Sequence, residues 1–203
     1  MKTLELADLD RLYRPPGKLV LDKVLNLVEK HGRSFIALSP FCVVSSAGSD
    51  GGIDVSPRGG EPGFVHVSED GRTLFLPDRP GNNRLDTLRN LLAGSGRIGL
   101  MFMIPGFEDV YRVNGRAAAT DDPDLLAQFE EFGKLPRLVI AVTVEEAFFH
   151  CPKAIMRSRL WDPEAQVDRA TLPTGAEMIF DQLQLGKVPV SEEQIVASYK
   201  EQL

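Results

Sequence analysis

The residues best suited to chemistry lie in the segment Pro77–Leu92, where a strand-like stretch ends and a helical pattern begins. Asn82, Asn83 and Arg84 come just before a stripe of leucines at helical spacing, and Arg79 precedes a Pro-Gly turn. A helix start offers unpaired backbone N–H groups and the positive end of the helix dipole. Arginine can add paired hydrogen bonds to phosphate oxygens. The segment therefore predicts a phosphate-binding site.

The same segment has a simpler interpretation. In it, Asn82 or Asn83 caps the helix and Arg84 points into solvent, as is common at helix starts. Local features alone leave both interpretations open.

Composition limits the kinds of partner. The 203 residues carry a net charge of −6, which argues against a large basic surface for nucleic acid or an anionic membrane. Any anion site must therefore be local. The apolar runs are shorter than a membrane-spanning helix needs, and the first 18 residues lack the apolar core of a secretory signal. We expect a cytoplasmic protein without nucleic-acid or membrane partners.

Other reactive side chains are scattered. Cys42 and Cys151 share no C-x-x-C spacing, which suits a reducing compartment, and we expect Cys151 to be structural. The three histidines lack the spacing of metal ligands, so no metal site is expected. Glu145 and Glu146 are interpreted as a charged strand end rather than an acid–base pair. No catalytic residue can be named.

Hydrophobic periodicity predicts mostly strands. A helix is expected over Leu21–Val28 with Gly32 as its stop, followed by a strand over Ser34–Ala47 that Pro40 breaks. Further strands are expected over Ile53–Val55, Gly63–Val67, Thr73–Leu76, Arg97–Ile104, Val110–Ala119 and Leu138–Phe149.

Helix signals are clearest in the second half of the chain. Asp122 as cap, Pro123 at the first position and Gly133 as stop predict a short helix. Two capping boxes open the last helices, Thr174 with Glu177 and Ser191 with Gln194.

Short-turn connections favour a mainly β (α+β) fold, an antiparallel barrel with flanking helices, over a parallel βαβ sheet. We expect a single domain, 1–203, with a leader and N-terminal helix (1–32), a barrel core (33–150) and a C-terminal helical segment (151–203). The dinucleotide fingerprint GxGxxG and the phosphate loop GxxxxGK[ST] do not occur.

Four blocks resemble the FMN-binding split-barrel family of pyridoxamine 5'-phosphate oxidase. They are IDVSPRGGEPGFVHV, TLFLPDRPGNNRLDTLRNLL, IGLMFMIPGFEDVYRVNGRA and FFHCPKAIMRSRLW, in the family's order over Ile53–Trp161. The resemblance implies an antiparallel split β-barrel whose homodimer holds two FMN molecules at the interface. The form of the phosphate segment and the C-terminal tail resemble a branch distinct from the true oxidases.

The resemblance also implies cofactor contacts. The phosphate would meet Asn82, Asn83 and Arg84, with Arg79 as a further charge. The ring or ribityl chain would lie along the strand IDVSPRG, and further contacts would come from the strand YRVNGRA and from a second subunit's segment after the last strand. The implied residues are Asp54, Val55, Ser56, Arg58, Arg112, Lys153, Arg157, Ser158 and Trp161, with Asn114 ranked below Arg112.

Each block keeps an ordinary structural alternative. Ser56–Gly59 could form a plain turn, and Asn114 with Gly115 could mark a bulge or a turn. Trp161, the only tryptophan, could fill a core or an interface as well as wall a flavin ring.

The resemblance implies an FMN-dependent oxidoreductase that acts on a small molecule, with NAD(P)H as a further partner. The lysine, tyrosine, arginine and serine that bind the substrate phosphate in true oxidases cannot be placed here. Two alternatives stay open, because a fold does not fix a function. One is a non-catalytic flavin or haem carrier or sensor, and the other a deazaflavin-dependent reductase on the same barrel.

Overall fold

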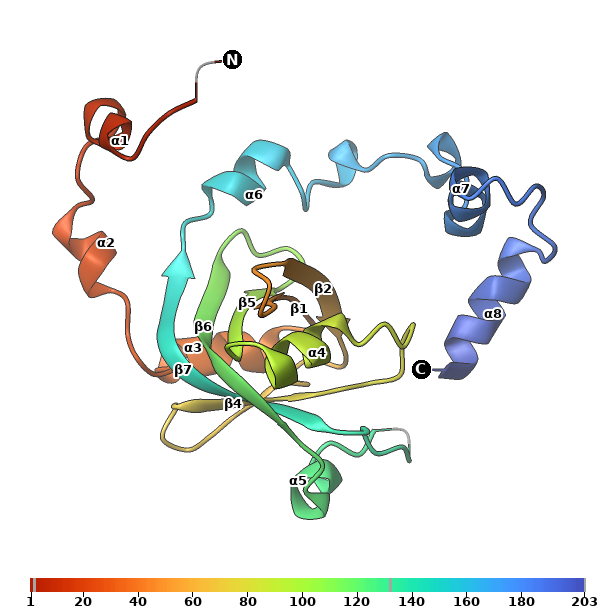
Figure 1. The fold of residues 1–203 in the computed structure, drawn as a ribbon, viewed down its shortest axis with the longest axis horizontal. Helices are drawn as coiled ribbons and strands as arrows, with labels where there is room; N and C mark the ends of the chain where they lie inside the picture. Colours follow the sequence, from red (N-terminus) through yellow and green to blue (C-terminus); the bar gives the residue numbers. More distant parts are fainter. Residues whose placement is uncertain (2, 132, 203) are drawn as a thin grey trace.

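A computed structural model describes residues 1, 3–131 and 133–202, and these residues form one antiparallel sheet with flanking helices (Figure 1). The strand order is β2-β1-β5-β6-β7-β4-β3, with β2 and β3 at the two edges. The strands are β1 (Phe41–Ala47), β2 (Ile53–Gly59), β3 (His66–Val67), β4 (Thr73–Pro77), β5 (Arg97–Met103), β6 (Val110–Thr120) and β7 (Val139–His150). The predicted mainly β, antiparallel architecture is confirmed, and the sheet is open in the described part of the chain.

The core lies on one side of this sheet. Val44, Phe102 and Val113 are fully buried there, because alternate residues of a strand point to the same face. Helices α3 (Lys30–Leu38) and α4 (Asp86–Ala93) cover this side, with Ile36 and Leu88 packed into the core. The opposite side of β2, β1, β5 and β6 stays open over much of its area (Figure 1).

The N-terminal expectations are partly wrong. The chain forms α1 (Ala7–Leu12) and α2 (Lys18–Asp22), and α3 occupies the first part of the expected strand. The Glu29 carboxylate accepts hydrogen bonds from the backbone N–H groups of His31 and Gly32, and so starts α3 there. Gly32 lies inside α3 against the Tyr111 ring, where a Cβ would clash. Gly32 thus permits close packing rather than ending a helix.

The start of α4 also differs from the expectation. Neither asparagine caps the helix: Leu85 holds the N-cap position with φ of 60°, and no side chain caps it. The Asn82 side chain instead accepts the N–H of Arg84 at 3.1 Å, and Asn83 has φ of 57°. Two left-handed residues therefore bend the chain sharply before the helix, a conformation that is costly for leucine.

A bulge interrupts the ladder between β6 and β7. Asn114 pairs with Glu146 and Gly115 with Val144, so Glu145 is an extra residue on β7. The two glutamates lie inside β7, not at its end as expected, and both are exposed. The alternative that Asn114 and Gly115 mark a bulge is confirmed.

The later helices begin where their caps predicted, although the first of them ends at Ala127 and not near Gly133. Asp122 caps α5 (Pro123–Ala127) through the N–H groups of residues 124 and 125. Both predicted capping boxes form, at α7 (Gly175–Gln182) and α8 (Glu192–Gln202). The remaining helices are α6 (Lys153–Ser158) and the short turns η1 (Pro163–Ala165) and η2 (Arg169–Thr171).

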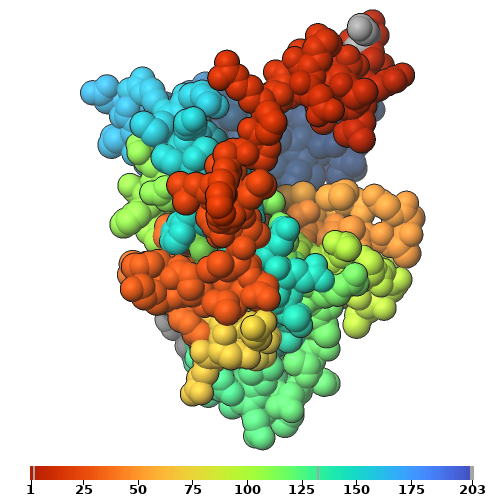
Figure 2. Space-filling view, turned by 90° about the vertical axis from the view of Figure 1, so that its left-hand side faces the viewer, coloured from red at the N-terminus to blue at the C-terminus, as the bar shows by residue number. Residues whose placement is uncertain are grey.

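The two ends of the chain extend from the sheet. Residues 163–202, here called the C-terminal arm, run outward from α6 to α8, and α1 and α2 leave the main body on another side (Figures 1 and 2). Both segments expose large apolar side chains, among them Leu6, Tyr13, Ile179 and Leu185. None of the helices formed by the described residues is long and apolar enough to cross a membrane.

Candidate functional site

Three predicted cofactor residues point from one face of β2 toward α4. Asp54, Ser56 and Arg58 are half-buried there, whereas Val55 points to the opposite face. The Thr87 hydroxyl, at the first turn of α4, donates to Asp54 Oδ2 at 2.9 Å and lies 3.2 Å from Ser56 Oγ. These contacts fix the start of α4 against β2. We call Asp54, Ser56 and Arg58, together with Asp78 and the segment 82–87, the α4 site.

Arg58 carries an unusual polar atom in this site. Its Nη1 lies 3.5 Å from Asp78 Oδ1, with side-chain exposures of 24% and 12%. Its Nε is buried and has no hydrogen-bond partner among the described residues. Burial raises the pKa of Asp78, although the positive charges of Arg58 and Arg137 oppose that rise. An unpaired buried donor is costly, so Arg58 Nε is suited to a ligand's acceptor atom.

Arg84 stands at the exposed rim of the same site. Its Nε donates to Asp86 Oδ2 at 2.7 Å, and the guanidinium is 75% exposed. The hydrogen bond from Arg84 to Asp86 raises the pKa of Arg84, which stays charged in any case. Asn82 and Asn83 are exposed beside it. Arg84 is therefore accessible to a phosphate, in competition with Asp86.

Arg79 is engaged elsewhere. Its Nη2 donates to the Phe129 carbonyl at 2.7 Å and pairs with Glu131 at 2.8 Å. These contacts tie the loop before α4 to the segment after α5. A phosphate contact from Arg79 stays a prediction, and it would require the arginine to leave these partners.

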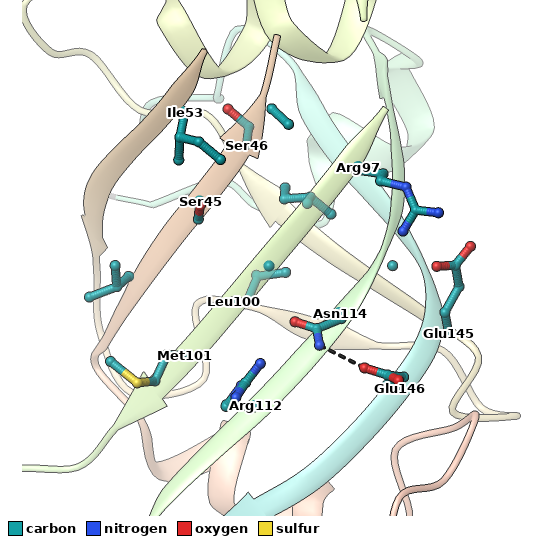
Figure 3. A pocket seen from close by; sticks show the side chains of 15 residues that line it. Ser45, Ser46, Ile53, Arg97, Leu100, Met101, Arg112, Asn114, Glu145 and Glu146 are labelled. Carbon is teal, nitrogen blue, oxygen red and sulfur yellow. Dashed lines mark hydrogen bonds between the residues drawn. The ribbon is translucent and has the colours of Figure 1, made fainter. Parts of the chain in front are cut away.

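Arg112 and Asn114 lie on the other face of the sheet. They line an open pocket of ≈ 700 Å³, together with side chains of β1, β5 and β7 (Figure 3). The Asn114 amide donates to Glu146 Oε2 at 2.8 Å. The structure thus separates these two residues from the α4 site by the thickness of the sheet.

The predicted residues after the last strand lie in and beyond α6. Lys153, Arg157 and Ser158 are exposed, and the Ser158 hydroxyl donates to the carbonyl of Ile155. Trp161 donates its ring N–H to the Phe107 carbonyl at 2.6 Å. None of these four is linked by a hydrogen bond or ion pair to the α4 site within the described chain.

Three polar residues of the α4 site were not predicted from the sequence: Asp78, Asp86 and Thr87. Thr87 is a buried polar residue on an otherwise apolar helix face, and that pattern was a usable signal. The two aspartates gave none, because carboxylates beside a phosphate-binding segment resemble ordinary solvated charges.

The α4 site fits a phosphate group in its donor chemistry. Arg58 offers a buried N–H without a partner and Arg84 an exposed guanidinium. Three carboxylates, Asp54, Asp78 and Asp86, outnumber these two guanidinium groups, so a phosphate must also overcome repulsion in the site. No cluster of three or more potential metal-ligating side chains occurs in residues 1, 3–131 and 133–202.

A model of the family described as pyridoxamine 5'-phosphate oxidase matches residues 28–151, well over half of the chain. The chain belongs to the pyridoxamine 5'-phosphate oxidase-like family. The predicted family, as a branch distinct from the true oxidases, is confirmed. The matched range contains β1 to β7, the α4 site and the pocket, and it ends before α6 and the C-terminal arm.

Solved structures resemble the chain in fold. HupZ of Group A Streptococcus is 15% identical, with a TM-score of 0.48, covering 61% of this chain and 94% of that one. HutZ of Vibrio cholerae, described as a haem storage protein, is 14% identical, with a TM-score of 0.42 and coverages of 61% and 94%. A structure described as an F420 reductase is 15% identical, with a TM-score of 0.40 and coverages of 58% and 94%. No curated protein matches the sequence.

Proposed function

We propose that the chain is an FMN-binding oxidoreductase that acts on a small molecule, with FMN bound between the split barrels of two copies. The observation that carries the proposal is the unpaired, buried Nε of Arg58 beside the exposed Arg84, at the α4 site of an oxidase-like fold. An acidic protein that binds an anion needs local donors of this kind.

In this proposal Arg84, Asn82 and Asn83 bind the phosphate at the rim, and Arg58 Nε donates to the same ligand from inside the site. Ser56 and Asp54 orient the polar chain of the ligand from one face of β2. Val55, on the opposite face of β2, lies along the flavin. Lys153, Arg157, Ser158 and Trp161 of the partner subunit would complete the site, since none contacts it within one chain.

Bound FMN would supply the electron transfer itself. The protein's own residues bind the phosphate, shield one ring face and leave the other open to a substrate, so no protein acid or base is obligatory. NADH or NADPH is the proposed electron donor and the cytoplasm the proposed location. The two cysteines, Cys42 and Cys151, are free, as suits a reducing compartment.

The first test is the visible spectrum and flavin content of the purified protein. We expect oxidised flavin absorbance and about one FMN per chain after reconstitution. Bleaching by NADH or NADPH and recovery with an electron acceptor would support the enzyme over a carrier. A colourless protein that takes up no FMN would contradict the proposal. A haem spectrum, or a preference for a deazaflavin, would support one of the two alternatives instead.

A matched pair of variants tests the α4 site. Arg84→Ala should weaken FMN binding roughly tenfold or more, because it removes a charge-assisted contact to phosphate. Arg89→Ala is the control, since Arg89 is an exposed cation farther along α4. Fluorescence titration of FMN measures both affinities. Equal affinities in the two variants would remove Arg84 from the site.

A further inference from the structure

The open face of the sheet presents aligned rows of side chains. In one row the strand register places Val43, Met101, Arg112 and Phe148 side by side on β1, β5, β6 and β7. The next row brings together Ser45, Gly99, Asn114 and Glu146. The pocket of ≈ 700 Å³ lies over these rows (Figure 3). This volume suits a small organic ligand.

Arg112 is the half-buried cation of this pocket, and it lacks a counter-ion. Its guanidinium lies over the Phe148 ring, 5.1 Å from the centroid, and pairs with no carboxylate among the described residues. Two glutamates line the same pocket. Glu145 pairs with Arg116 at 3.2 Å, and Glu146 accepts the hydrogen bond from Asn114. The acidic groups of the pocket are thus committed to other partners.

A second cation shares the same aromatic ring. Lys23 Nζ lies 5.4 Å from the Phe148 centroid and donates to the Phe149 carbonyl at 2.7 Å. No described carboxylate pairs with Lys23 either. Two partly buried cations around one ring repel each other, and cation–π contact offsets only part of that cost. An anion next to Arg112 would relieve it.

We propose that this pocket binds the carboxylate of a small, largely apolar molecule, and that Arg112 is the residue that selects it. Its half-buried guanidinium, which has no carboxylate partner in the described chain, matches a singly charged carboxylate in the paired geometry of arginine. Met101 and Val43 border it with apolar surface, and Asn114 and Ser45 add hydrogen-bonding groups in the next row. The inference rests on the proposed function, because it names the substrate class of the flavin enzyme.

A second arginine of the pocket, Arg97, is less suited to this role. Its side chain lines the pocket at the start of β5, but it is exposed (Figure 3). Water screens an exposed charge more strongly than a half-buried one. Arg112 is therefore the stronger determinant of binding.

This site differs from the phosphate site by position. Ile53 of β2 lines the pocket, whereas its neighbour Asp54 points toward α4. Successive residues of a strand point to opposite faces, so the two sites lie on opposite sides of β2. The effect of replacing Arg112 on ligand binding can therefore be separated from the effect of replacing Arg84 on phosphate binding.

The test is binding of benzoate, and of its neutral analogue benzamide, to the FMN-loaded protein by calorimetry. Arg112→Met keeps an unbranched, flexible side chain and removes its charge. Arg89→Met is the control, because Arg89 is an exposed arginine of α4 that does not line the pocket. Benzoate should bind the wild type and Arg89→Met equally, and bind Arg112→Met roughly tenfold or more weakly. Benzamide should bind Arg112→Met as it binds the wild type.

Several outcomes would overturn this assignment. Failure of benzoate to bind the wild type, or equal binding to both variants, leaves Arg112 without a selective role. Dissociation of Arg112→Met into single chains, with benzoate affinity unchanged, would assign Arg112 to a carboxylate of the partner subunit. If Arg112→Met weakened FMN binding as much as Arg84→Ala does, Arg112 would be assigned to the flavin site.

The proposed function can also fail separately. A protein that takes up no FMN, but whose benzoate binding still depends on Arg112, would contradict the flavin proposal and support the carboxylate pocket. In all variants a thermal unfolding curve checks the fold. Arg112→Lys, which keeps the charge without the paired geometry, should show an intermediate affinity.

Discussion

The balance of charge around Arg84 governs how tightly a phosphate can be held at the α4 site. Asp86 Oδ2 lies 2.7 Å from Arg84 Nε and pairs with it. Asp54 and Asp78 add negative charge deeper in the site. A bound phosphate would therefore compete with Asp86 for Arg84 and meet the repulsion of all three carboxylates. The affinity of the site depends on this exchange as much as on the number of donors.

Replacement of Asp86 tests the exchange. Asp86→Asn should bind FMN roughly two- to tenfold more tightly, because Arg84 loses its competing carboxylate and one repulsive charge disappears. Asp124→Asn, in the first turn of α5, is the control, since it also removes a helix-start aspartate. Flavin fluorescence titration gives both affinities. Weaker binding in Asp86→Asn would show that Asp86 positions Arg84 rather than competes for it.

Asp78 should give the protein a characteristic pH dependence. Burial raises its folded-state pKa above the ordinary 3.8, so the stabilisation from its neutral form is complete below that value. It is lost as pH rises through the folded pKa. Asp78→Asn does not titrate. The free energy of unfolding of Asp78→Asn minus that of the wild type should therefore increase as pH rises.

Urea unfolding of both proteins at pH values between about 4 and 7 measures this difference. A difference that decreases with pH would mean that the ion pair with Arg58 outweighs the burial of Asp78.

At the scale of elements, strand periodicity and turn residues predicted most of the sheet, as well as α5, α7 and α8. The predictions of helix ends failed where the same residue type occurs both at helix ends and in other structural settings. Gly32 resembles a helix stop, but it sits inside α3 because Tyr111 leaves no room for a Cβ. Asn82 and Asn83 resemble caps, but they form the bend that precedes α4.

Within the candidate site, the arginine donors could be predicted from the sequence, but the carboxylates that pair with them could not. Arg58 and Arg84 stand out by type and position along the chain. Their pairing with Asp78 and Asp86, and the empty position at Arg58 Nε, depend on how β2 meets the loop before α4. Such tertiary contacts leave no periodic pattern in a single sequence.

The bulge at Gly115 provides a test at this scale. In Gly115→Ala the new Cβ would clash with the backbone carbonyl of Thr143, so we expect a loss of roughly 1–3 kcal/mol in unfolding free energy. Gly99→Ala on β5 is the control, because its Cβ would meet only the movable Asn114 side chain at 3.3 Å. Chemical denaturation compares them. Equal stabilities would show that the bulge adapts without cost.

At the scale of the whole molecule, the chain exposes apolar surface at α1, α2 and the C-terminal arm, and leaves one face of its sheet open. The proposed homodimer would cover part of this surface. It also makes the flavin site depend on association, because α6 and Trp161 do not reach the α4 site of their own chain.

Dilution tests this dependence. If two copies form the site, the apparent affinity for FMN should fall as the protein concentration drops below the dimer dissociation constant, since ligand and partner bind the same state. Fluorescence titrations at several protein concentrations, with sedimentation velocity at each, measure both equilibria. Constant affinity and an FMN-bound single chain would show that one copy is sufficient.

The extra residue in β7 determines which aromatic ring lies beneath Arg112. Up to Val144 the even-numbered residues of β7 face the core, but after Glu145 the odd-numbered Ala147 is buried and Phe148 turns outward. Deleting Glu145 would restore the simple alternation and exchange the environments of Phe148 and Phe149. The chemistry of the open face thus depends on the length of β7. One residue more or less in this strand decides which of its aromatic rings packs in the core and which lies on the open face.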